Sequence, residues 1–301
     1  MTKMPMQYKR ILTVQDISCV GQCSMTVALP ILSACGLETC ILPTALLSTH
    51  TGGFGKPQVL HFDDALDGIW KHWQENEITF DAILVGYLGS IPAVETAERI
   101  LDAMLAPGGM AIVDPAMADH GTLYSGFDGD YVQAMARLCR KADILLPNIT
   151  EAAMLSGIEY KTHFDEAYVR ELLEGMNHNC VVLTGAVCEE GLTGVAVRSG
   201  DRQFRYVHKR MDKNYHGTGD IFAASFTGAL MQGKSLEDAV KIAAKFTCKC
   251  IENTAKAPAH WYGVKFETAL RSLIRMLEEG SSGLPQTAAV LFYGYPERSK
   301  F

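Results

Sequence analysis

The sequence lacks the cysteine patterns that bind zinc or build a disulfide framework. Its nine cysteines are odd in number and form neither a Cys-x-x-Cys pair nor a His/Cys zinc spacing. Several lie inside apolar runs, as in Cys180 to Leu183, where cysteine acts as a small hydrophobic side chain. We therefore expect free thiols and a reducing compartment, the cytoplasm.

Long apolar runs and concentrated positive charge are also missing. No run approaches the roughly 20 apolar residues that cross a membrane, and residues 1–6 form no apolar leader segment. The formal net charge is -7, and lysine and arginine are scattered along the chain. Scattered basic residues argue against a nucleic-acid footprint. These absences predict a cytoplasmic protein that partners with neither membranes nor nucleic acid.

The composition that is present allows a large core, with 48% apolar and 20% charged residues. Short β-rich runs alternate with helical patterns, which predicts βαβ units and an α/β fold whose mostly parallel sheet is covered on both faces. The expected strands are 10–15, 39–42, 82–85, 110–114, 143–146 and 181–184. The expected helices are about 24–34, 63–75, 94–105, 130–141, a short one after 148, and 165–176.

The rhythm changes after residue 184. A hairpin of 193–198 and 203–209 is expected, followed by helices over about 219–232, 236–253 and 265–279. Because no linker, repeat or low-complexity stretch divides the chain, we expect one domain over residues 1–301. We assign no element to the tail after about residue 280.

Polar or glycine-containing segments follow the expected strands. In open α/β sheets, ligands bind beyond the carboxyl ends of the strands, so these positions are candidate site residues. They are Asp16, His50 with Thr51, Tyr87, Asp114, Asn148 and Thr184. Their shared position predicts one binding site along this rim of the sheet.

Residues 228–235 match the phosphate-binding pattern G-x-x-x-x-G-K-[ST]. Such a loop must lie between a strand and a helix if its N–H groups are to converge on phosphate. Here residues 221–231, which run into the match, form one continuous apolar helical pattern. Gly233 is typical of a helix end, and Ser235 with Asp238 is typical of a capping box. We therefore interpret the match as a connection between two helices.

A better phosphate site precedes the same helix, at His216-Gly217-Thr218-Gly219-Asp220. Glycines let successive N–H groups point into one concavity, and the helix dipole adds about half a positive charge there. Such a site suits the charge that develops on a transferring phosphoryl group. Asp220, in the first turn, is placed to accept a proton from an attacking hydroxyl. The alternative is an ordinary N-cap at Thr218 with a first-turn acid at Asp220.

Gly217-Thr218-Gly219-Asp220 before an apolar helix resembles the C-terminal signature of the ribokinase-like kinases. Further features resemble that superfamily in the same order: Asp114-Pro115-Ala116-Met117, Asn148-Ile149-Thr150-Glu151 and Val181-Val182-Leu183-Thr184. Ser48-Thr49-His50-Thr51-Gly52, with Gly86-Tyr87-Leu88-Gly89, is similar to the pyridoxal/pyridoxamine kinase branch. The resemblance covers about residues 10–275. It implies a ribokinase-like three-layer α/β/α sandwich that phosphorylates the hydroxymethyl group of a vitamin B6 vitamer (pyridoxal, pyridoxamine or pyridoxine).

The resemblance also implies how phosphate is handled. Asp220 would be the catalytic base, and Gly217 to Gly219 would form the anion hole. The ATP-binding residues would be Asn148, Thr184 and Asp114. Mg²⁺ would lie near Asp114 and near Glu151, which holds it mainly through water. Kinases of this kind are typically homodimers that use MgATP, often with a monovalent cation such as K⁺. Asn148 and Glu151 could otherwise be a helix N-cap and its third-position acid.

On the substrate side, the resemblance places Thr51 and Tyr87 in the pyridoxal pocket, with His50 beside it. Asp16 departs from the branch, which usually carries a serine that meets the pyridine ring. An acid there could pair with a protonated ring nitrogen or an amino group, or it could be an Asx-turn or helix-capping acid. The usual glycine-asparagine of the first loop is also replaced, by Ser24-Met25.

Three other functions stay open. A hydroxymethylpyrimidine kinase of thiamine metabolism would share the fold and a hydroxymethyl heteroaromatic substrate. A sugar or nucleoside kinase would be expected to carry a Gly-Gly pair near residue 40, which Thr44-Ala45-Leu46 does not supply. A non-catalytic B6 binder would bind ligand without releasing ADP, and the intact Gly217 to Asp220 segment argues against it.

Overall fold

One large β-sheet organises the part of the chain that this computed structural model describes, residues 8–211, 215–257, 259–279 and 290–292. Its ten strands follow the order β12-β11-β10-β9-β8-β5-β4-β1-β2-β3 within these residues. Strands β2, β1, β4, β5, β8 and β9 run parallel, and the strands at the two edges are antiparallel. The strands are β1 (Arg10–Ser18), β2 (Glu38–Leu47), β3 (Val59–His61), β4 (Phe80–Val85), β5 (Leu105–Val113), β8 (Ile144–Leu145), β9 (Cys180–Thr184), β10 (Leu192–Ser199), β11 (Arg202–Lys209) and β12 (Val290–Phe292).

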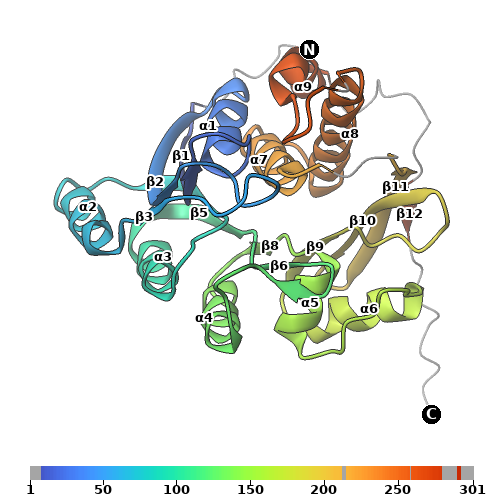
Figure 1. The fold of residues 1–301 in the computed structure, drawn as a ribbon, viewed down its shortest axis with the longest axis horizontal. Coiled ribbons are helices and arrows are strands. Elements are labelled where there is room, and N and C mark those ends of the chain that lie inside the picture. The colour runs from blue at the N-terminus through green and yellow to red at the C-terminus, as the bar shows by residue number, and fades with distance from the viewer. Residues whose placement is uncertain (1–7, 212–214, 258, 280–289, 293–301) are drawn as a thin grey trace.

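Helices cover both faces of the sheet (Figure 1). One face carries α1 (Met25–Ala34), α7 (Thr218–Met231), α8 (Leu236–Ala255) and α9 (Leu270–Glu278), with the 3₁₀ turn η1 (Phe266–Ala269). The other carries α2 (Asp63–Glu75), α3 (Ile91–Met104), α4 (Gly129–Cys139), α5 (Ile149–Ser156) and α6 (Glu166–Gly175). Buried apolar clusters fill the space on each side. The three-layer α/β/α prediction is confirmed.

The order of the strands reverses direction between β1 and β4. From β1 the chain moves outward to β2 and β3, then returns to the other side of β1 and continues through β4, β5, β8 and β9. At such a reversal the connections leave toward opposite sides, which opens a crevice beyond the strand ends where ligands bind. The carboxyl ends of β1 and β4 are therefore the expected mouth of a site.

Helix α7 lies at the centre of its layer because its sequence is apolar all round. Ile221 to Ala229 are buried, and the helix packs between α1, α8 and the sheet. A Cβ on Gly228 would lie 2.4 Å from Cys35 Sγ, so glycine permits the close approach of α1. Gly233 follows the helix at φ +77, and Ser235 caps α8 by accepting from Asp238 N at 3.1 Å. The phosphate-loop match is therefore a helix connection, as interpreted from the sequence.

Several boundaries differ from the sequence expectations. The short edge strand β3 was not expected, because three exposed residues carry no alternating pattern. Strand β5 begins earlier than expected, at Leu105, directly after α3. Leu105 pairs with Phe80 of β4, and the next paired residue of β5 is Met110, opposite Ala82. Residues 106–109 therefore form a bulge in the strand. The last expected helix is divided into η1 and α9.

The unassigned tail contributes β12, which pairs antiparallel with β11; its other residues lie outside the described part. A second, two-stranded sheet is formed by β6 (Ala118–Asp119) and β7 (Thr122–Leu123). Within the described ranges, no helix combines the length and apolarity needed to cross a membrane.

Candidate active site

The open N-terminus of α7 forms the centre of the candidate site. Gly217 is its N-cap residue, with φ +83, and a Cβ there would lie 2.4 Å from the Gln22 carbonyl oxygen. Thr218 donates its hydroxyl to Tyr215 O at 3.3 Å instead of capping the helix, so the N-cap alternative for Thr218 is wrong. With no side chain capping α7, its first N–H groups are available to an anion.

Asp220 lies in the first turn of α7, half-buried beside this terminus. Its carboxylate accepts a hydrogen bond from the backbone of Ser24, the residue before α1. Burial, with a smaller contribution from the nearby Asp16 carboxylate, raises the pKa of Asp220 to about 7, while the Ser24 hydrogen bond opposes the shift. A carboxyl group that titrates near neutral pH suits general base catalysis.

Asp16 lies inside β1, not after it as expected, because β1 extends to Ser18. The pairing of β1 with β2 shifts between Gln15 and Ile17, so Asp16 occupies an irregularity in the strand. Its backbone N donates to Tyr87 O at 3.1 Å, which ties β1 to the second residue after β4. Within a strand Asp16 cannot be a helix-capping acid, so that alternative is wrong.

A row of carboxylates runs along the rim from Asp16 through Asp220 and Asp114 to Glu151. Asp114 follows β5, and a Cβ on Gly219 would lie 4.0 Å from its Oδ2. Burial raises the pKa of Asp114, and the Asp220 carboxylate raises it further. Burial and the Asp114 carboxylate likewise hold the pKa of Glu151 well above its usual value. Both shifts mean that the ionised carboxylates are disfavoured here, first by burial and then by the neighbouring carboxylate.

Asn148 and Glu151 form a complete capping box at the start of α5. Asn148 Oδ1 accepts from Glu151 N at 2.9 Å, and Glu151 Oε2 accepts from Asn148 N at 2.8 Å. Met117 N donates to the other Glu151 oxygen at 3.2 Å, and Asn148 Nδ2 donates to Ala118 O at 2.8 Å. Asn148 also pairs with Thr184 in a single bridge at the end of β9. The interpretation of Asn148 as an N-cap and Glu151 as its third-position acid is therefore correct. The hydrogen bonds of the capping box also hold both side chains in place at the end of the carboxylate row.

Among the described residues, no three histidine, cysteine or acidic side chains converge as a direct metal site. The four carboxylates therefore form a row and not a closed metal cage; Asp16 and Glu151 are buried, and Asp114 and Asp220 are partly exposed. Partly exposed carboxylates can hold a hydrated cation that also contacts phosphate oxygens.

His50 meets the other side of the α7 terminus. The centroids of the His50 and His216 rings are 4.7 Å apart. The Nδ1 atom of His50 accepts a hydrogen bond from Gly52 N at 2.9 Å. A Cβ on Gly52 would lie 2.6 Å from His216 Nε2, so glycine allows this approach. Burial lowers the pKa of His50, with His216 as a second cause. Thr51 is exposed in this loop, and the structure does not bring it to the carboxylate row.

Sequence reasoning missed Cys23 and the contact that His216 makes. His216 adjoins the glycine motif but shows its relation to His50 only in three dimensions. Cys23 is buried, and the pKa of its thiol is raised by burial and by Asp220 and Asp16. Trp261 packs against Phe54 with ring centroids 4.6 Å apart. The contact joins the loop after β2 to the loop after α8.

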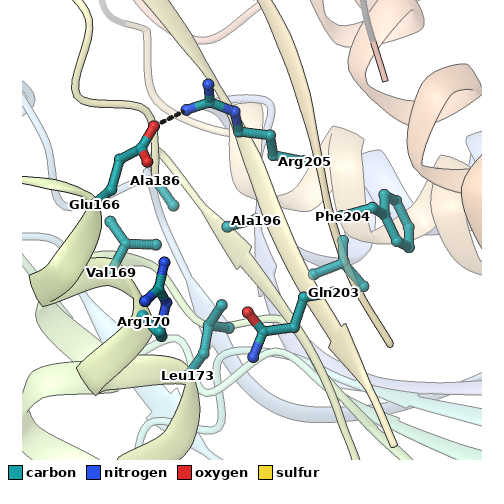
Figure 2. Close-up of a pocket in the computed structure, with 10 residues that line it drawn as sticks. Glu166, Val169, Arg170, Leu173, Ala186, Ala196, Gln203, Phe204 and Arg205 are labelled. Atoms are coloured by element: carbon teal, nitrogen blue, oxygen red, sulfur yellow. Dashed lines mark hydrogen bonds and ion pairs between the residues drawn. The ribbon is translucent and has the colours of Figure 1, made fainter. Parts of the chain in front are cut away.

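A separate shallow pocket lies between α6 and the β10–β11 hairpin (Figure 2). Val169, Ala196 and Phe204 line it, and Glu166 binds Arg205 at its edge at 2.6 Å. None of the predicted site residues lines this pocket. The candidate active site is therefore the strand-end rim at α7.

Comparisons with known proteins identify the family. The family described as phosphomethylpyrimidine kinase matches residues 32–264. The pyridoxine/pyridoxal/pyridoxamine kinase of Bordetella avium is 30% identical over 261 residues, 82% of this chain and 86% of the relative.

Two solved structures superpose on nearly the whole chain. Pyridoxal kinase from Lactobacillus plantarum has a TM-score of 0.82 and 33% identity, covering 90% of this chain and 99% of that one. A Bacteroides thetaiotaomicron protein assigned as a phosphomethylpyrimidine kinase, in a crystal form with pyridoxal, has a TM-score of 0.83 and 31% identity, covering 95% and 100%. The chain thus belongs to the phosphomethylpyrimidine kinase family, as a pyridoxal kinase-like member with a ribokinase-like fold.

Proposed function

We propose that this protein transfers the γ-phosphoryl group of ATP to the hydroxymethyl group of a vitamin B6 vitamer, in the salvage of pyridoxal 5'-phosphate. The observation that carries the proposal is Asp220, a carboxyl group with a pKa near neutral at the uncapped N-terminus of α7. Asp220 takes the proton of the attacking hydroxyl, and the N–H groups of residues 217–219 stabilise charge on the transferred group. Positioning and electrostatics supply most of the acceleration in such reactions.

Mg²⁺ fits the acidic rim. Burial, and then a neighbouring carboxylate, raises the pKa values of Asp114 and Glu151, so their ionised forms are costly and a bound cation would offset that cost. We assign Asp114 to the metal and the phosphates, and Glu151 to the metal through water. Asn148 and Thr184, beside each other at the ends of β8 and β9, are assigned to ATP phosphate. When bound, the metal neutralises phosphate charge. We also propose that a monovalent cation such as K⁺ assists the reaction. Measuring activity after K⁺ is exchanged for tetramethylammonium tests this part of the proposal.

The proposed acceptor pocket lies at the reversal between β1 and β4. Asp16 and Tyr87 meet there through a backbone hydrogen bond, and His50 approaches from the loop after β2. Thr51 is retained as a pocket residue on the resemblance alone. The relatives that act on B6 vitamers, and the crystal form with pyridoxal, support a vitamer as the acceptor. The family's own description supports hydroxymethylpyrimidine as the second candidate acceptor.

We also propose a homodimer in which residues 1–301 act as one kinase domain. The continuous sheet from β3 to β12 supports the single domain. Edge strand β3 exposes Val59 and Leu60, at 46% and 58%, and exposed apolar edges favour association. Light scattering of the purified protein tests the dimer, and a monomeric mass at working concentration would refute it.

The function is tested by ADP release from MgATP with pyridoxal, pyridoxamine, pyridoxine and hydroxymethylpyrimidine, using Asp220→Ala as the inactive control. Turnover of the vitamers that vanishes in the variant supports the proposal. Turnover of the pyrimidine alone moves the protein to thiamine metabolism. Ligand binding without ADP release from any acceptor would identify a non-catalytic binder.

A further inference from the structure

Gln22 links the loop between β1 and α1 to the C-terminal part of the chain. Its side-chain Nε2 donates a hydrogen bond to Glu267 Oε1 at 2.8 Å, across 245 positions of sequence. Glu267 lies in the turn η1, which follows α8. An ionised carboxylate only accepts hydrogen bonds, so the amide of Gln22 must present its N–H to Glu267, and the bond is charge-assisted.

The backbone of Gln22 lies directly against the start of α7. A Cβ on Gly217, the N-cap residue of α7, would lie 2.4 Å from the Gln22 carbonyl oxygen. At so close an approach, a shift of Gln22 would change the space available to Gly217. Two residues further on, the backbone of Ser24 donates to the carboxylate of Asp220. Residues 22–24 therefore contact both the proposed anion hole and the proposed base.

This short segment has an unfavourable backbone conformation. Gln22 has φ +53 and Ser24 has φ +51, values that residues with a Cβ rarely adopt. Such a conformation persists only where the surrounding structure enforces it. The hydrogen bond to Glu267 supplies one constraint of this kind, because it holds the side chain of Gln22 in place.

The turn η1 is a suitable anchor for Gln22 because it is fastened to the helical layer. Thr268, the residue after Glu267, accepts a hydrogen bond from Asn253 Nδ2 of α8 at 3.0 Å. Phe266, the residue before Glu267, is buried in the apolar cluster that also contains residues of α7 and α8. The bond from Gln22 to Glu267 thus connects the segment beside the anion hole to the packed core.

We propose that Gln22 is a positioning residue for phosphoryl transfer, and that its hydrogen bond to Glu267 holds the start of α7 in the geometry that binds the transferred phosphoryl group. This inference rests on the proposed function and names a residue pair that acts through Gly217. When the bond is lost, the contact between Gln22 and Gly217 loosens, and the N–H groups at the start of α7 align less well with the transferred group. Such misalignment lowers kcat, because preorganised donors stabilise the charge of the transition state.

The test reverses the hydrogen bond. Gln22→Glu places two carboxylates against each other, and Gln22→Glu combined with Glu267→Gln restores one donor and one acceptor with their roles exchanged. With MgATP and pyridoxal, kcat of Gln22→Glu should fall by about 10-fold, while the affinity for pyridoxal stays within about 2-fold of wild type. The double variant should recover to within about 3-fold of the wild-type kcat. A wild-type kcat in Gln22→Glu, or a double variant as slow as the single one, would overturn the inference.

A binding measurement adds a readout that does not depend on turnover. Calorimetry compares MgADP with MgAMP-PNP, a non-hydrolysable ATP analogue that carries the third phosphate. Because the proposed anion hole binds that phosphate, the ratio of the two affinities should fall by about 5-fold in Gln22→Glu and return in the double variant. A purely structural role would leave the ratio unchanged, and an unchanged ratio would contradict positioning.

Asn253→Ala is the matched control, because it removes an exposed hydrogen bond to the same turn, at Thr268, and leaves Gln22 untouched. It should keep the wild-type kcat and affinity ratio. An equal loss in this control would show that any loosening of η1 is sufficient, which would refute a specific role for Gln22. Gln22→Ala removes the bond without adding repulsion and should change kcat in the same direction, so it replaces Gln22→Glu if thermal unfolding shows that protein to be unfolded.

The two proposals fail differently. If the wild-type protein phosphorylates vitamers and Gln22→Glu matches it in kcat and in the affinity ratio, only the role of Gln22 is wrong. If the affinity ratio changes as expected but the wild type releases no ADP with any acceptor, the kinase function is wrong and the positioning of the α7 terminus by Gln22 stands.

Discussion

The carboxylate of Asp220 accepts a hydrogen bond from the backbone of Ser24, which joins the first turn of α7 to the residue just before α1. Ser24 holds φ +51 and ψ -129, a conformation that glycine adopts far more readily than serine. The proposed base is therefore positioned by a strained residue at the place where the kinase branch usually carries glycine-asparagine.

Ser24→Gly and Ser24→Ala separate backbone strain from the side-chain interaction. Both remove the hydroxyl, which stabilises the ionised Asp16 carboxylate. Only glycine relieves the positive φ, so the alanine variant should be less stable than the glycine variant by about 1–2 kcal/mol. Urea unfolding at pH 7.5 measures the difference, and an alanine variant as stable as glycine would show that Ser24 is unstrained.

Gly217→Ala should damage activity because the new Cβ would meet the Gln22 carbonyl oxygen at 2.4 Å. The N-terminus of α7 would have to move, which would disturb the N–H groups that are proposed to bind phosphate. We expect kcat to fall by about 10²-fold or more, as when a preorganised donor is lost. Gly233→Ala is the matched control: its φ is +77 and nothing lies near its Cβ, so it should cost about 1 kcal/mol of stability with normal kcat. Equal kcat in the two variants would contradict the role of Gly217.

Asp16 should make stability depend on pH in a defined direction. Its pKa is raised from 3.8 to about 6, so the folded state prefers the protonated form. That contribution is complete below about pH 4 and is lost as the pH rises to about 6. Asp16→Asn cannot ionise, so its stability relative to wild type should rise over this window by at most about 3 kcal/mol and then level off. Unfolding measured from pH 4 to 8 tests this, and a constant difference would contradict it.

Asp114→Asn should raise the Mg²⁺ concentration that gives half-maximal activity by about 10-fold, because a neutral amide attracts the hydrated ion less. It should also lower the pKa of Glu151, which the Asp114 carboxylate raises. A Mg²⁺ titration at saturating ATP and vitamer measures the first effect. An unchanged Mg²⁺ requirement would remove Asp114 from the metal site.

The layers of the fold and the position of Asp220 follow from local pattern. Apolar runs of strand length alternating with amphipathic helices specify the sheet, and glycines before an apolar helix mark the start of α7. Other features depend on distant approaches that no local pattern records. The β1 irregularity that displaces Asp16 arises from its pairing with β2, and the His50–His216 contact joins residues 166 positions apart. Strand β3 is too short and too exposed to leave a periodic signal.

The central claim is that Asp220 is the catalytic base, and kcat of Asp220→Asn with MgATP and a vitamer tests it most directly. Asp238→Asn, a first-turn acid of the next helix, is the matched control. We predict that kcat of Asp220→Asn falls by about 10²- to 10⁴-fold, with ATP affinity within a few-fold of wild type and with the control unchanged. A kcat near the wild-type value in Asp220→Asn would contradict the account.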